Sequence, residues 1–140
     1  LSRPAAYPRL PAPTRLKTPM NAATFDRHCY LEKKRMTQET FAEGPCPNAA
    51  NTKIRALHLD DRQTALLKEA VSLLLTDAYY TLLLGLDGSC PIGDAEQQTY
   101  RLYDEADNLL TGNGDLEAAA YAYFHEGQYE QENPSDGADA

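Results

Sequence analysis

The sequence predicts an α+β fold in which a long central apolar helix, a C-terminal β-hairpin and a closing amphipathic helix pack on a small antiparallel sheet. Three patterns support this prediction. Apolar residues recur every three or four positions from 62 to 84, apolar and polar residues alternate on either side of residues 104–108, and helical spacing returns after residue 115. The chain has 140 residues, 42% apolar and 24% charged, which is typical of one globular domain.

The composition divides the chain into four segments. Residues 1–19 contain five prolines and four basic residues, so we expect a disordered leader there. Residues 20–50 are poorly defined by their pattern; a short helix is expected early in this segment, and Pro45 and Pro47 break the chain after it. Residues 51–130 are expected to form the single α+β domain, and the acidic residues 131–140 a disordered tail.

The central helix has the clearest start signal in the chain. Asp60 is placed to accept amides of the first helical turn, and Gln63 is placed to reach back to the backbone of Asp60, as in a capping box. The apolar stripe that follows predicts a helix over residues 62–84. Gly85 is expected to end it in a left-handed turn.

The apolar surface of this helix is wide enough that the sequence predicts cover on several sides. Leu74→Ala and Leu82→Ala are therefore each expected to destabilise the protein by about 2–5 kcal/mol. The longest apolar stretch, residues 70–86, is shorter than the roughly 20 residues that span a membrane. We therefore interpret it as a buried helix and expect no membrane anchor.

The sheet is expected to come from short strands on either side of the helix. Residues 53–59 alternate weakly and predict a short strand. Residues 99–103 and 109–111 are expected to pair as a hairpin across a turn at 104–108. A hairpin alone is marginal in water, so it should pack against the long helix.

A second amphipathic helix is expected after the hairpin. Asp115 is its predicted N-cap, and Gly127 its end. Apolar side chains lie at the spacing of one buried helical face, at Leu116, Ala119, Ala120, Tyr123 and Phe124.

Charge is unevenly distributed along the chain, and the net charge is −8. Residues 1–75 carry 12 basic and 7 acidic residues, whereas residues 76–140 carry 14 acidic residues and Arg101. An acidic C-terminal half repels nucleic acid, so nucleic-acid binding is not expected. A basic protein partner suits this charge.

The three cysteines, Cys29, Cys46 and Cys90, form no CxxC pair. Their number and spacing argue against a disulfide framework and against a standard zinc site. We therefore expect a reducing, cytoplasmic location.

The turn-rich loop at residues 85–94 is the strongest candidate for chemistry. It lacks the spacing of phosphate-binding loops, and the acidic residues beyond it lack the order of a calcium-binding loop. No metal site and no cofactor are predicted, and the favoured interpretation is a structural turn that packs Ile92 on the helix end. If the loop is reactive, the groups to consider are Asp87, Ser89, Cys90 and Asp94.

The leading functional hypothesis is a small, non-catalytic protein-binding module that neutralises a basic partner, as immunity and antitoxin proteins do. This analogy rests on size and charge. Tyrosines supply the expected anchors and carboxylates the expected ionic contacts, at Asp104, Glu105, Asp107, Glu117, Tyr103 and Tyr121. Two alternatives stay open: a small hydrolase or transferase that uses the 85–94 loop, and a homo-oligomer subunit that shares the apolar surface of the long helix. The oligomeric state is not determined by the sequence.

Overall fold

The structure is a computed structural model that describes residues 19–45 and 48–135. Helices make up 60% of these residues, which contain no β-strand and no sheet. The predicted α+β fold is therefore wrong, and the described part of the chain is all-helical. Residues 1–18 of the expected leader, Cys46 and residues 136–140 of the expected tail lie outside the described residues. The described helices are α1 (Ala22–Thr40), α2 (Ala49–Ala56), α3 (Asp61–Leu86), α4 (Asp115–His125) and α5 (Gln128–Glu132).

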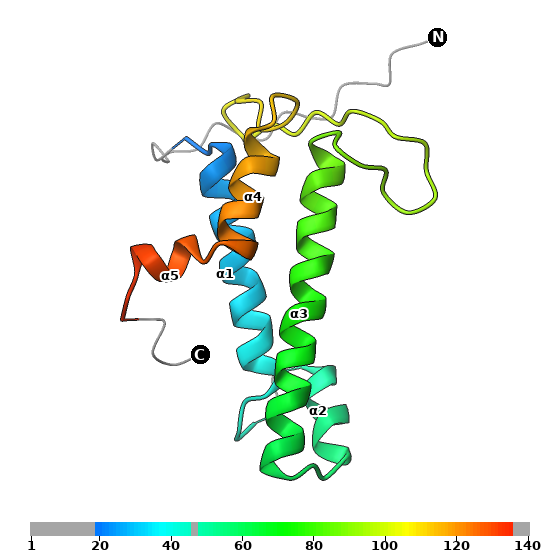
Figure 1. Cartoon of the computed structure of the whole chain (residues 1–140), viewed down its shortest axis with the longest axis vertical. Coiled ribbons are helices and arrows are strands. Elements are labelled where there is room, and N and C mark those ends of the chain that lie inside the picture. The colour runs from blue at the N-terminus through cyan, green and yellow to red at the C-terminus, as the bar shows by residue number, and fades with distance from the viewer. Residues whose placement is uncertain (1–18, 46–47, 136–140) are drawn as a thin grey trace.

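Helices α1, α3 and α4 pack together at one end of the molecule (Figure 1). α4 contacts both α1 and α3, α2 lies beside the N-terminal end of α3, and α5 extends sideways from the end of α4 (Figure 1). α4 has 11 residues, whereas α3 has 26. Because α4 is so much shorter, it covers only the C-terminal part of α3.

The core fills the space among α1, α3 and α4. α4 contributes Leu116, Ala120, Tyr123 and Phe124, so the apolar face predicted for the last helix is confirmed for these four residues. Tyr30 of α1 meets Phe124 edge to face, with ring centroids 5.4 Å apart. The segment 20–50, which has no clear sequence pattern, therefore supplies an aromatic side chain to the same core as α4.

The short strand expected at residues 53–59 is also wrong, because α2 occupies most of this segment. Asn48 accepts the Asn51 amide at 2.8 Å and caps α2. The buried Asn51 side chain donates in turn to the carbonyls of Thr40 and Ala42, at 2.9 and 3.0 Å. These bonds satisfy both the start of α2 and the end of α1, which favours two helices joined by a short connection.

The predicted start of the long helix is confirmed by the geometry of α3. The Gln63 amide donates to Asp60 Oδ1 at 2.8 Å, and the Asp60 amide donates to Gln63 Oε1 at 3.0 Å, which completes the capping box. The expected left-handed turn lies at Gly88, with φ 83°, and Gly85 is inside the helix. As expected, Ile92 packs on the helix end, where a Cβ atom at Gly85 would collide with it.

The predicted hairpin has its turn and no strands. Tyr103 and Leu109 form an isolated antiparallel bridge, and the Leu110 amide donates to the Leu102 carbonyl at 2.8 Å. The Leu102 amide then donates to the hydroxyl of Thr111 at 3.1 Å. A side chain thus accepts the bond that a backbone carbonyl would accept in a ladder, and the pairing does not extend into a sheet.

Candidate functional site

Most of α3 is exposed, which corrects the expectation of a covered central helix. The buried residues of α3 are Thr76, Leu83 and Gly85. Leu74 is 68% exposed and Leu82 46% exposed, so neither belongs to the core. The reason is geometric: α1 and α4 pack against the side of α3 that carries Leu83, and the wide apolar surface beyond it has no other element to cover it in the described part of the chain.

Exposed apolar side chains on α3 form a row in which consecutive members are four residues apart. We call this set, Leu66, Ala70, Leu74, Ala78 and Leu82, the leucine-alanine row. Residues four apart are neighbours on a helix surface, so the row is a continuous ridge of the kind that packs into the groove of another helix. The alanines leave hollows between the leucines that side chains of a partner can fill. Contiguous exposed apolar surface of this kind is typical of an interaction site.

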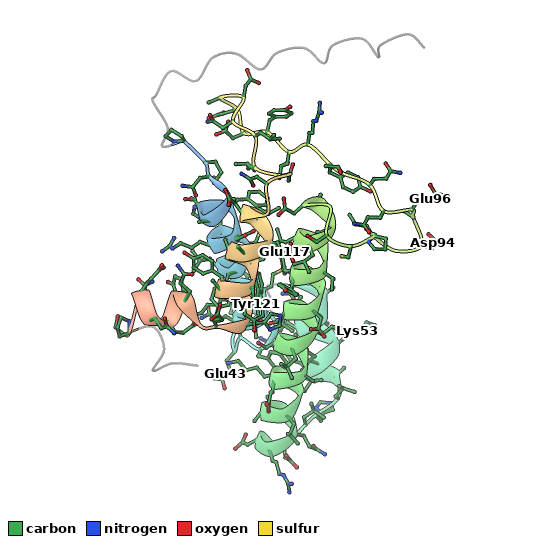
Figure 2. All side chains as sticks on the ribbon, turned by 45° about the horizontal axis from the view of Figure 1, so that its top comes forward. Glu43, Lys53, Asp94, Glu96, Glu117 and Tyr121 are labelled. Carbon is green, nitrogen blue, oxygen red and sulfur yellow. The ribbon has the colours of Figure 1, made fainter. Side chains whose placement is uncertain are left out.

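Acidic side chains lie at the C-terminal end of the row. Asp77 is exposed beside Ala78, and the loop after α3 carries Asp94 and Glu96, both exposed (Figure 2). Residues 87–117 contain eight acidic residues and one basic residue, Arg101. The row therefore runs from the N-terminal end of α3 toward a strongly negative end of the molecule.

Asp104, a predicted partner-binding carboxylate, holds its own loop together. Its Oδ1 atom accepts the amides of Ala106 and Asn108, each at 2.9 Å, and its Oδ2 atom accepts the Asn108 side chain at 2.8 Å. The amide of Met20 donates to Oδ2 at 3.2 Å. These bonds, the Asn108 side chain first, lower the pKa of the Asp104 carboxyl. Asp104 therefore orders the loop in addition to contributing negative charge.

The other predicted carboxylates lie on two different elements. Glu105 and Asp107 are exposed in the loop that Asp104 orders. Glu117 lies in the first turn of α4, where its Oε2 atom accepts the Ser89 hydroxyl at 2.5 Å (Figure 2). The structure thus brings three of the four carboxylates into one loop and places the fourth on a helix.

The two predicted tyrosine anchors are exposed and belong to separate elements. Tyr103 in the loop and Tyr121 on α4 are each 51% exposed. Tyr121 lies in a surface aromatic cluster with Tyr80 and His125, at centroid distances of 6.4 and 5.5 Å. The sequence pattern did not predict this cluster, although the four-residue spacing of Tyr121 and His125 places both on one face of a helix.

Asp87 and Ser89, two of the loop candidates, connect the end of α3 to the start of α4. The buried Asp87 carboxylate accepts the Gly112 amide at 2.7 Å and the Glu117 amide at 3.0 Å. The N-cap residue of α4, Gly114, has no side chain that can cap, and the predicted cap Asp115 lies inside the helix. Asp87 supplies the missing acceptor from a distant part of the chain.

Cys90 and Asp94 complete the set of loop candidates. The Cys90 thiol donates to the Thr81 carbonyl with an S···O distance of 3.7 Å. Within the described residues, no hydrogen bond joins Cys90 to a histidine, and no group of three or more His, Cys, Asp or Glu side chains is placed to hold a metal ion. Asp94 is exposed. The loop thus presents four separate polar groups, three of which make hydrogen bonds within the structure.

A buried carboxyl group in α1 was not anticipated from the sequence. Asp26 is 0% exposed, and neither of its carboxyl oxygens has a hydrogen-bond partner in the described part of the protein. Burial, and then the charge of Asp87, raise its pKa to about 8. Burial, followed by Asp26 and Glu32, raises the pKa of the Cys29 thiol to about 11, so this thiol is protonated at neutral pH.

α3 also meets, by length and composition, the criteria for a helix that crosses a membrane. The 18-residue window that meets them has a mean hydropathy of 1.2, and 17% of it is buried. The core helix of a soluble protein can meet the same criteria of length and composition. Such a helix is mostly buried, whereas α3 is mostly exposed.

The chain was compared with family models, curated proteins and solved structures, and none of them matches it.

Proposed function

We propose that this chain is a non-catalytic protein-binding module that docks a basic amphipathic helix of another protein on the leucine-alanine row. The observation that carries the proposal is the exposure of Leu66, Leu74 and Leu82, at 57%, 68% and 46%, on one ridge of α3. Full burial of an exposed leucine contributes about 1.5–3 kcal/mol. Successive members of the row are offset by about 40° around the helix axis, so a straight partner helix covers Leu74 and one neighbouring leucine, which stabilises a complex by roughly 2 kcal/mol before other contacts are counted.

The charge of the surroundings supports a basic partner. A helix that lies along the row comes close to Asp77 and approaches the acidic end of the molecule that carries Asp94 and Glu96. Complementary charge raises the association rate and fixes the orientation of a docked helix. In binding, the module would mask the basic surface of its partner, which is how an immunity-like inhibitor acts.

Other occupants of the row suit it less well. A second copy would bring another net charge of −8 to the interface, and a lipid bilayer would have to accept the exposed carboxylate of Asp77 near the middle of α3. An aspartate at the centre of a membrane helix costs about 2.5–3.5 kcal/mol. A basic protein helix instead offers Asp77 a lysine or arginine.

The enzyme alternative has weaker support from the 85–94 loop. Asp87 accepts the backbone amide of Glu117, and Ser89 donates its hydroxyl to the Glu117 carboxylate. The polar groups of both residues are therefore already engaged in joining α3 to α4. A nucleophile needs an adjacent base, and among the described residues the hydrogen bonds of Ser89 and Cys90 go to Glu117 and Thr81 and not to a histidine.

The test uses a fluorescein-labelled 18-residue amphipathic peptide of leucine and lysine, and a matched peptide of leucine and glutamate. Fluorescence anisotropy with the full chain at low and high salt should show binding of the lysine peptide alone, with association slowed at high salt. Sedimentation of the free chain and co-sedimentation with lipid vesicles test the other two occupants. Self-association or vesicle binding that depends on Leu74 would show that a second copy of the chain or a lipid bilayer covers the row, and would overturn the proposed basic helix.

The decisive variants carry the same substitution at two exposed leucines. Leu74→Glu places a charge in the centre of the row and should weaken peptide binding by about tenfold or more, since loss of a central contact costs more than 1 kcal/mol. Leu57→Glu is the matched control, because Leu57 is 60% exposed and lies outside the row, after α2. Equal affinity of both variants would refute the proposal.

A further inference from the structure

A groove of about 600 Å³ lies between α1 and α3, on the side from which α5 extends. Its volume is within the range of small-molecule sites. Tyr30, Lys33 and Lys34 of α1 line one wall, and Lys68, Ser72 and Leu73 of α3 line the facing wall. Glu69 of α3 and Glu130 of α5 also line it, so three lysines face two glutamates and the lining keeps an excess of positive charge. The groove is separate from the leucine-alanine row, because no member of the row lines it.

The lysines of the groove differ in how their charges are balanced. Lys34 pairs with Glu130, with 3.7 Å between Nζ and Oε1, and lies 4.8 Å from the ring centre of Tyr129. Lys33 lies over the ring of Tyr30, 5.4 Å from its centre. Within residues 19–45 and 48–135, no carboxylate lies within 4 Å of the ammonium group of Lys33 or Lys68.

Lys33 is the more constrained of these two lysines. Burial, with a contribution from the charge of Lys34, lowers the pKa of Lys33, whereas Glu130 acts in the opposite direction. Glu130 is already shared, because it accepts the Tyr30 hydroxyl and pairs with Lys34. A bound anion would supply the counter-charge that Lys33 lacks.

The remaining lining is suited to an apolar chain. Leu73, which is 60% exposed, lines the groove together with the exposed Ala65. The structure therefore places positive charge and apolar surface in one groove. A small inorganic anion would use the charge alone, and a neutral lipid would use the apolar surface alone.

We propose that this groove binds an amphipathic carboxylate of the fatty-acid type, with its carboxylate between Lys33 and Lys68 and its alkyl chain along Leu73 and Ala65. The inference goes beyond the proposed docking of a basic helix, since it concerns different residues and a ligand of opposite charge.

Calorimetric titration of the full chain with octanoate, 1-octanol and inorganic phosphate separates the two parts of the ligand. Octanoate should bind at one site per chain. The affinities of octanol and phosphate should each be lower by about tenfold or more, because each of these probes lacks one of the two interactions. Comparable binding of octanoate and octanol would show that the lysines do not hold the carboxylate. Comparable binding of phosphate would show a simple anion site, and either result overturns the proposal.

Matched lysine variants locate the site. Lys33→Met keeps an unbranched side chain and removes the positive charge. The affinity for octanoate should therefore fall by about tenfold or more, while the affinity for octanol is unchanged. Lys53→Met is the control, because Lys53 is exposed on α2, outside the groove (Figure 2). Lys68→Met provides a second test on the facing wall in case Lys33→Met does not fold. Octanoate binding that survives both Lys33→Met and Lys68→Met contradicts the proposed site.

Discussion

The carboxylate of Asp87 caps α4 from the end of α3, because its Oδ2 atom accepts the amide of Glu117, the third residue of α4, at 3.0 Å. Its Oδ1 atom accepts the Gly112 amide at 2.7 Å. One buried side chain thus joins two helices that 28 residues of loop separate in the sequence. The end of the bundle that carries the acidic loops depends on this residue for its order.

Asp87→Ala should destabilise the protein by about 1–3 kcal/mol, because it leaves the amides of Gly112 and Glu117 without their acceptor. Urea unfolding at pH 6 measures the effect under conditions in which the nearby Asp26 is mostly protonated. Asp94→Ala, in the same loop and exposed, is the control and should change stability by less than about 0.5 kcal/mol. Equal effects of the two substitutions would contradict the capping role.

Asp26 should make the protein less stable as the pH rises. Its carboxyl has a pKa of about 8 in the folded state against an ordinary value of 3.8, so the folded state binds the proton more tightly than the unfolded state. The free energy of unfolding is therefore highest below about pH 4 for this group and falls by several kcal/mol, on the order of 5, as the pH rises to about 8.

Comparison with Asp26→Asn isolates that contribution. Asparagine does not titrate, so the difference in unfolding free energy between the variant and the original protein should grow in favour of the variant from pH 4 to pH 8. Contributions from groups that the two proteins share cancel in this difference. A difference that stays constant over this range would show that Asp26 is charged, or free to ionise, in the folded state.

Substitution of an exposed leucine of α3 should change the stability of the protein much less than substitution of a leucine of the core. Leu74→Ala is expected to change the unfolding free energy by about 0.5 kcal/mol or less, since Leu74 is exposed. Leu116→Ala removes a side chain that is 0% exposed and should cost about 2–5 kcal/mol. Thermal unfolding of the two variants measures both changes in stability. A large loss in Leu74→Ala would mean that α3 is covered in solution.

Gly85→Ala should destabilise the protein, although alanine is the better residue inside a helix. The added Cβ atom would collide with Ile92, and overpacking of this kind costs about 1–3 kcal/mol. Ile92→Ala removes the colliding atoms, so the double variant should be more stable than the sum of the two single effects predicts. Strict additivity in this double-mutant cycle would show that the two residues do not meet.

Local signals in the sequence determined several parts of this protein. The capping box of Asp60 and Gln63 starts α3 because both partners lie within one turn of the chain. The spacing of Leu116, Ala120 and Phe124 identifies the buried face of α4 for the same reason, since periodicity within one helix is independent of what covers it. The turn ordered by Asp104 and Asn108 is equally local.

Contacts between distant residues decided what the sequence did not predict. The alternation around the turn suggests two strands, but Thr111 bonds to Leu102 across the turn and the ladder stops. The apolar surface of α3 suggests a covered helix, but the length of α4 leaves Leu74 exposed and creates the candidate site. The burial of Asp26 and the capping of α4 by Asp87 depend on how helices meet in space, because the energy of a buried polar group is set by neighbours that are remote in the chain.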